Sequence, residues 1–163
     1  MPEIGGPVKV FLADDSAFIR QRVAAMLARR AIKIVGQAET PQQSIDGILA
    51  VRPDVVVLDV QLEGGTGLQV LRAVREIEPG IAFIVFSNHA APPYRKRYLG
   101  EGAWRFLDKA AEFDQLVDAV EQAPRSRPFP VIAGNIDAIE TGRIVGESAV
   151  IDRGQPAGPP CVE

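Results

Sequence analysis

Five polar residues lie just after the ends of short apolar runs in this 163-residue sequence. They are two adjacent aspartates, a third aspartate, a serine and a lysine: Asp14, Asp15, Asp59, Ser87 and Lys109. A carboxylate at the end of a buried segment is costly unless a cation or hydrogen bonds compensate its charge. If the apolar runs form one sheet, these side chains meet at one edge and act on a common ligand.

The three aspartates together favour a divalent cation. Carboxylates packed close together repel one another, and their pKa values rise unless a cation compensates. Mg²⁺ binds oxygen ligands, keeps several waters, and takes one or two carboxylates together with a phosphate oxygen. We expect Asp15 and Asp59 to coordinate Mg²⁺ directly, Asp14 to do so directly or through a water, and the backbone carbonyl of Gln61 to reach the ion.

A phosphoryl group is the substrate that suits such a site. Asp59 follows the third apolar run, which we expect to be a central strand, so it is the predicted nucleophile. Lys109 would neutralise one phosphoryl oxygen and Ser87 would donate a hydrogen bond to another, which is the positioning and charge neutralisation that phosphoryl transfer requires. Taken singly, each residue has a simpler explanation: Asp14 and Asp15 suit a helix N-terminus, Ser87 a turn, and Lys109 the surface.

The elements that must position these residues alternate along the chain. Apolar runs predict strands at 8–13, 32–38, 53–59, 81–86 and 102–107. Amphipathic periodicity predicts helices at 16–30, 41–52, 68–78, 92–101 and 113–123. Thr40 before Pro41, with Gln43 at the capping-box position, is a strong helix start. On the third helix the stripe is Leu68, Leu71, Val74 and Ile77.

This alternation predicts the α/β class, with a parallel sheet, right-handed crossovers and helices on both faces. We take the strand order 2-1-3-4-5 from the flavodoxin-like group, a doubly wound five-stranded parallel sheet with five helices. In that order strands one and three are neighbours, so the three aspartates meet at the carboxyl edge. We expect residues 1–7 to be a flexible leader and 8–124 the domain. Six of the thirteen prolines lie from Pro124 onward. We expect residues 125–163 to be a Pro/Gly-rich tail without a recognisable output domain.

Composition excludes several classes of protein. The net charge of −3 argues against a DNA-binding role, which requires a strongly basic face. Cys161 is the single cysteine and His89 the single histidine, so the sequence contains no disulfide framework and no Cys- or His-rich metal site. No apolar run approaches the ~18 residues of a membrane span, and the N-terminus does not resemble a secretion signal. These features predict a cytoplasmic protein.

The ordered motifs resemble the receiver domain of two-component response regulators, over roughly residues 7–123. The matching segments are the acidic pair Asp14-Asp15, Leu58-Asp59, the loop Gly64–Leu68, Ser87, and Phe106-Leu107-Asp108-Lys109. The resemblance, closest in type to the single-domain chemotaxis receiver, implies a stand-alone protein phosphorylated on Asp59 by a histidine kinase or phosphotransfer protein, with Mg²⁺ as cofactor. It implies no enzyme activity beyond assisted phosphorylation and dephosphorylation of its own aspartate. It also implies a switch made of Ser87 and Phe106.

The resemblance also implies a surface for a downstream protein target. The helix that carries Tyr94 to Tyr98 is basic and aromatic, and with the fifth strand it is the predicted docking face. The simpler interpretation is an ordinary solvated helix face. His89 is interpreted as a solvated loop residue.

Three positions depart from the family pattern, and they leave two alternatives open. Glu63 and Ala110 stand where many receivers have proline, and Asn88 stands where a small residue is usual. The first alternative is a degenerate receiver that acts as a phosphorylation-independent interaction module. The second is a phosphohydrolase with an aspartyl-phosphate intermediate of the haloacid-dehalogenase type, which the adjacent acids and Ser16 disfavour because that type needs an Asp-x-Asp pair.

Overall fold

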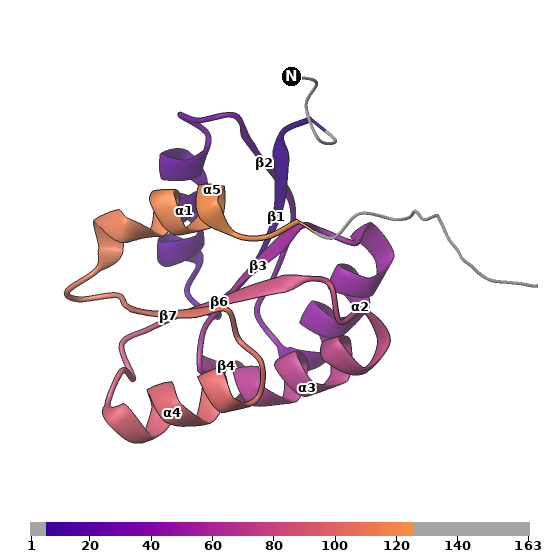
Figure 1. The fold of residues 1–163 in the computed structure, drawn as a ribbon, viewed down its shortest axis with the longest axis vertical. Coiled ribbons are helices and arrows are strands. Elements are labelled where there is room, and N and C mark those ends of the chain that lie inside the picture. The colour runs from indigo at the N-terminus through magenta and orange to yellow at the C-terminus, as the bar shows by residue number, and fades with distance from the viewer. Residues whose placement is uncertain (1–5, 126–163) are drawn as a thin grey trace, which may run out of the picture. The chain divides into compact units, whose positions relative to one another are not determined.

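The apolar runs pair into one parallel sheet. The computed structural model describes residues 6–125, and within them five strands follow the order β2-β1-β3-β6-β7 (Figure 1), which confirms the predicted flavodoxin-like order 2-1-3-4-5. The strands are β1 (Val8–Ala13), β2 (Ile32–Ala38), β3 (Val55–Leu58), β6 (Ala82–Ser87) and β7 (Arg105–Asp108). All four pairings are parallel. Most of the predicted leader (1–7) and of the predicted tail (125–163) lies outside the described residues.

Helices cover both faces of the sheet. They are α1 (Ala17–Leu27), α2 (Pro41–Val51), α3 (Gly67–Ile77), α4 (Pro92–Gly100), the short 3-10 helix η1 (Phe113–Gln115) and α5 (Leu116–Gln122). Figure 1 shows α1 and α5 on one side of the sheet and α2, α3 and α4 on the other. In the described part of the chain, no helix is both long and apolar enough to cross a membrane.

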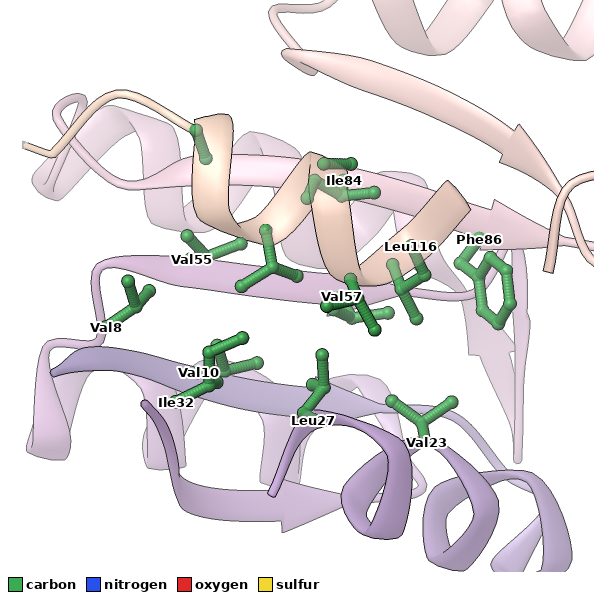
Figure 2. Close-up of a cluster of buried hydrophobic side chains, with 14 of the residues drawn as sticks. Val8, Val10, Val23, Leu27, Ile32, Val55, Val57, Ile84, Phe86 and Leu116 are labelled. Atoms are coloured by element: carbon green, nitrogen blue, oxygen red, sulfur yellow. The ribbon is translucent and has the colours of Figure 1, made fainter. Parts of the chain in front are cut away.

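Each face has its own apolar core, because successive residues of a strand point to opposite sides. In β3, Val55 and Val57 join the core beneath α1 and α5, which Figure 2 shows with Val23 and Leu27. Val56 joins the core beneath α2, α3 and α4. Every residue of β3 is buried, as expected for a central strand covered on both faces. The carboxyl end of this strand therefore places Asp59 at the sheet's centre.

The helix starts follow local chemistry. Ser16 precedes α1, and its hydroxyl accepts a hydrogen bond from the Ile19 amide at 3.2 Å. Thr40 precedes α2, its hydroxyl accepts from the Gln43 amide at 3.1 Å, and Pro41 is the first helical residue, which confirms the predicted start.

Several predicted boundaries are wrong. The fifth strand begins at Arg105 because Gly102 takes a left-handed conformation (φ 108°) and turns the chain before it reaches β6. The Gly-rich segment after Asp59 was expected to be a loop, but it contains a small antiparallel hairpin, β4 (Gln61–Leu62) and β5 (Gly65–Thr66). Ile77 does not belong to the buried stripe predicted for the third helix, because it is 60 % exposed. Six residues after Leu71 a helix has turned by roughly 240° beyond a whole turn, so Ile77 faces away from Leu71.

Candidate functional site

The predicted residues meet at the carboxyl edge of the sheet. Lys109 Nζ lies 2.7 Å from Asp14 Oδ2 and 3.1 Å from Asp59 Oδ2. The three side chains come from the ends of β1, β3 and β7, and no more than a tenth of each is exposed. Ninety-five residues separate Lys109 from Asp14 in the sequence, so only the strand order brings them together.

The aspartates form a group that suits a hard cation. Asp14, Asp15 and Asp59 each offer a carboxylate oxygen, and these oxygens lie within 4.8 Å of one another. Asp15 is exposed and the other two are buried. Three carboxylates face one ammonium group, so the group keeps an excess of negative charge. Oxygen donors with excess negative charge fit Mg²⁺, and Gln61, next in line on β4, lies on the same pocket wall.

The pKa values reflect this crowding. Burial raises the pKa of the Asp14 carboxyl, and the hydrogen bonds from Lys109 Nζ and the Ser16 amide offset only part of the effect. Burial by itself would lower the pKa of the Lys109 ammonium group, but the hydrogen bond to Asp14 and the charge of Asp59 outweigh burial, so that pKa is raised. Lys109 is therefore firmly cationic at neutral pH, whereas Asp14 lacks full compensation for its charge.

Ser87 lies on the wall of an open pocket of about 470 Å³. The pocket is lined by Asp15, Asp59, Gln61, Leu62, Glu63, Gly64, Ser87, Asn88 and His89. Ser87 is buried, and its Oγ accepts a hydrogen bond from the His89 amide at 3.1 Å. Because that bond uses an oxygen lone pair, the hydroxyl hydrogen remains available to a ligand in the pocket.

Backbone contacts fix the loops around Asp59. The Asp59 amide donates to Ala13 O at 2.9 Å, and the Lys109 amide donates to Ser87 O at 3.0 Å. A Cβ at Gly67 would lie 2.1 Å from Asp59 O, so the first residue of α3 must be glycine for the hairpin to close this tightly. These contacts hold the carboxylate and the ammonium group at a fixed separation.

A larger hollow, of about 540 Å³, lies between α3 and the end of α4. Its lining pairs its own charges: Arg72 lies 2.7 Å from Glu101. This pairing lowers the pKa of Glu101. With its charges balanced and its lining formed by surface side chains, this hollow offers no nucleophile, and the aspartate pocket is the better candidate site.

Two features of the site region escaped the sequence analysis. His89 is exposed, as expected for a loop residue, but it also lines the pocket beside Asp59. Tyr98 was placed on the exposed basic helix, and this is wrong: it is 3 % exposed and its hydroxyl donates to Val60 O at 3.4 Å. One isolated apolar position in a charged helix gives no periodic signal, so the sequence could not distinguish Tyr98 from Tyr94.

Comparison with known families decides the identity. Residues 10–121 match the model of the response regulator receiver domain. This chain belongs to that family. The carboxylate group, Ser87 and Lys109 therefore lie in a receiver fold, as the motifs indicated.

Curated relatives agree with this assignment. The receiver is 29% identical over 116 residues to response regulator GacA of Pseudomonas aeruginosa, which covers 71% of this chain and 54% of that protein. It is 30% identical over 166 residues to protein-glutamate methylesterase/protein-glutamine glutaminase 1 of Carboxydothermus hydrogenoformans, which covers 94% of this chain and 48% of that protein. The chain spans about half the length of these curated relatives.

Solved structures share the fold. The receiver domain of the response regulator NarL from Mycobacterium tuberculosis is 32% identical, with a TM-score of 0.67 over 74% of this chain and 95% of that one. A chain of the CheX-CheY-BeF3-Mg+2 complex from Borrelia burgdorferi is 21% identical, with a TM-score of 0.66 over 70% of this chain and 87% of that one, and shows the fold alone.

Proposed function

We propose that this receiver accepts a phosphoryl group on Asp59 from a histidine kinase or a phosphotransfer protein, and passes the signal on through protein contacts. One observation carries the proposal: Lys109 Nζ contacts both Asp14 and Asp59, and Asp15 completes a carboxylate group at the mouth of the pocket that contains Ser87. We also propose a cytoplasmic location, where the protein would meet its phosphodonor. The stand-alone organisation remains a prediction.

The chain's own residues divide the work. A carboxylate oxygen of Asp59 forms a bond to phosphorus while the bond from phosphorus to the donor atom breaks, and the donor keeps that electron pair and takes up a proton. Lys109 neutralises a phosphoryl oxygen, and Ser87 donates a hydrogen bond to another. Asp14, Asp15, Asp59 and the Gln61 carbonyl would hold Mg²⁺, and the bound ion would supply positive charge that offsets the repulsion between the carboxylates.

Phosphorylation adds negative charge and three acceptor oxygens at the carboxyl edge. Phe106 is already buried, so movement of the Ser87 loop would then shift the population between two states of the surface formed by α4 and β7, rather than create a new fold. Tyr94 and Leu99 of α4 are each 45 % exposed, which suits contact with a protein target.

The test is phosphorylation by acetyl phosphate with Mg²⁺, followed by intact mass. We expect one phosphoryl group on the wild type and none on Asp59→Asn. Asp118→Asn, which alters an exposed carboxylate on α5, is the matched control and should be labelled like the wild type. An unlabelled wild type, or equal labelling of Asp59→Asn, would refute the proposal.

A second candidate is a phosphorylation-independent interaction module. Glu63 and Asn88 line the pocket mouth and add a carboxylate and an amide beside Asp59. Absence of both Mg²⁺ binding and phosphorylation would favour this function. The phosphohydrolase alternative has less support. That chemistry needs an Asp-x-Asp pair, and Ser16, which stands at the second position of such a pair, caps α1 instead.

A further inference from the structure

Arg95 of α4 ties together three segments beside the site. Its Nε donates to Ala90 O, its Nη1 to Phe106 O and its Nη2 to Glu112 Oε1, each at 3.1 Å. The same oxygen of Glu112 accepts the Asp108 amide at 2.8 Å. We call Arg95 and Glu112, with these bonds, the Arg95 clamp.

The clamp closes over the side chain of Phe106. The Arg95 guanidinium carbon lies 5.2 Å from the centroid of the Phe106 ring, within the range of a cation–π contact. The Tyr98 ring meets Phe106 edge-on, with centroids 6.0 Å apart and planes at 74°. Phe106 is 4 % exposed although it lies on an edge strand, and these two side chains are among the neighbours that cover it.

The clamp also holds both loops that reach the pocket. Ala90 lies three residues after Ser87, and Asp108 directly precedes Lys109. A guanidinium group stays charged at any ordinary pH and presents its donors in a fixed fork, so one side chain restrains both backbone segments at once. None of these bonds involves an atom of Asp59, so the clamp forms without modification of Asp59.

We propose that Arg95 and Glu112 are positioning residues that hold Phe106 buried before phosphorylation and so set the resting conformation of the α4–β7 face. The link to output rests on the proposed phosphoacceptor function. Because the clamp already orders the loops of Ser87 and Lys109, it also favours binding of a phosphoryl group. Losing the clamp should therefore weaken that binding, since only the ordered fraction of molecules would be competent.

The experiment uses the full chain and NMR, with the nuclear Overhauser effect between the Phe106 and Tyr98 rings as the signal. Beryllofluoride with Mg²⁺ serves as the phosphoryl mimic. In the wild type we expect a strong signal with and without the mimic. In Arg95→Ala we expect a weak signal that the mimic restores, and roughly three- to tenfold weaker binding of the mimic. Arg95→Lys should behave like Arg95→Ala, because lysine lacks the fork.

Arg97→Ala is the matched control. Arg97 lies on the same helix, is 57 % exposed and makes one long ion pair, at 3.8 Å to Glu101. It should match the wild type in both measurements. If Arg95→Ala caused only a general loss of packing, the ring contact would not return when the mimic binds in the aspartate pocket.

The outcomes separate the two proposals. A folded Arg95→Ala with the wild-type ring signal in the absence of the mimic overturns the clamp. If Arg95→Ala does not fold, the ring signal of Glu112→Gln without the mimic decides the clamp instead. This variant keeps an acceptor for the Asp108 amide and removes only the charge. A wild type that does not bind the mimic contradicts the phosphoacceptor function, while the ring signals without the mimic still decide the clamp.

Discussion

Two cationic side chains, Lys109 and Arg95, join separate segments of this domain, but in opposite electrostatic settings. Lys109 is 6 % exposed and lies between two buried carboxylates, with Asp15 close by. Arg95 is 35 % exposed and meets one carboxylate and two backbone carbonyls. The first group has unbalanced charge, and the second is balanced by its own partners. The difference separates a site that can take a ligand from a contact that fixes structure.

Burial determines how much each pair contributes to stability. Removing one partner from a buried ionic group leaves the other charge uncompensated, whereas an exposed pair is screened by water.

The largest effect is expected from Lys109→Met. Without Mg²⁺ it should lower the free energy of unfolding by about 3–5 kcal/mol, because Asp14 and Asp59 lose their buried cation. Arg95→Met should cost only about 1 kcal/mol, since its ion pair is partly exposed. Urea unfolding measures both. Equal losses would show that the two settings do not differ in energy.

Gly67→Ala tests how tightly the backbone is packed at the site. Its Cβ would meet Asp59 O at 2.1 Å, so we expect a loss of at least about 2 kcal/mol and weaker Mg²⁺ binding. Gly100→Ala at the end of α4 meets nothing within 4 Å and is the matched control, with a change of under about 1 kcal/mol. Thermal unfolding of the two variants compares them, and a harmless Gly67→Ala would contradict the geometry.

Mg²⁺ should stabilise the unbalanced group and leave the balanced one unaffected. At about ten times its dissociation constant, Mg²⁺ should raise the free energy of unfolding by about 1.4 kcal/mol. Asp59→Asn should lose most of this gain, and Glu112→Gln should keep it. Melting curves with and without Mg²⁺ report the effect. The same gain in Asp59→Asn would place the ion elsewhere.

The smallest effect concerns Tyr98, which lies between the two regions. Its hydroxyl donates to Val60 O, next to Asp59, and its ring packs on Phe106. Burial raises the pKa of Tyr98 to about 12 from 10.0. The folded state therefore holds this proton more tightly than the unfolded state, so stability is unaffected below pH 10 and falls as the pH rises towards 12.

Tyr98→Phe should lose under about 1 kcal/mol at neutral pH, the value of one hydrogen bond. It should also lack the alkaline loss attributed to Tyr98. Unfolding free energies of both proteins across pH 9 to 12 provide the check, and parallel curves would rule out Tyr98 as the titrating group.

The sequence predicts the strands of the sheet and the polar residues that meet at its carboxyl edge. Unbroken apolar runs such as Val55–Leu58 occur where a strand is covered on both faces, and the residues after them lie at the carboxyl edge. Asp14, Asp59 and Lys109 could therefore be placed at one edge from the chain alone, and the strand order taken from the flavodoxin-like group made Asp14 and Asp59 neighbours. The start of α2 was also predictable, since capping by Thr40 is local chemistry.

Contacts between polar side chains of distant segments follow no periodicity, and they are visible only in the folded chain. Arg95 looked like one of several surface cations, and Glu112 lies seventeen residues away in a loop. Their pairing depends on the turn at Gly102 and on the short strand after it, whose start the sequence placed three residues too early. Hydrophobic periodicity reports which face of an element is buried. The partner of a polar side chain depends on the final placement of several elements, and that placement exists only in the folded chain.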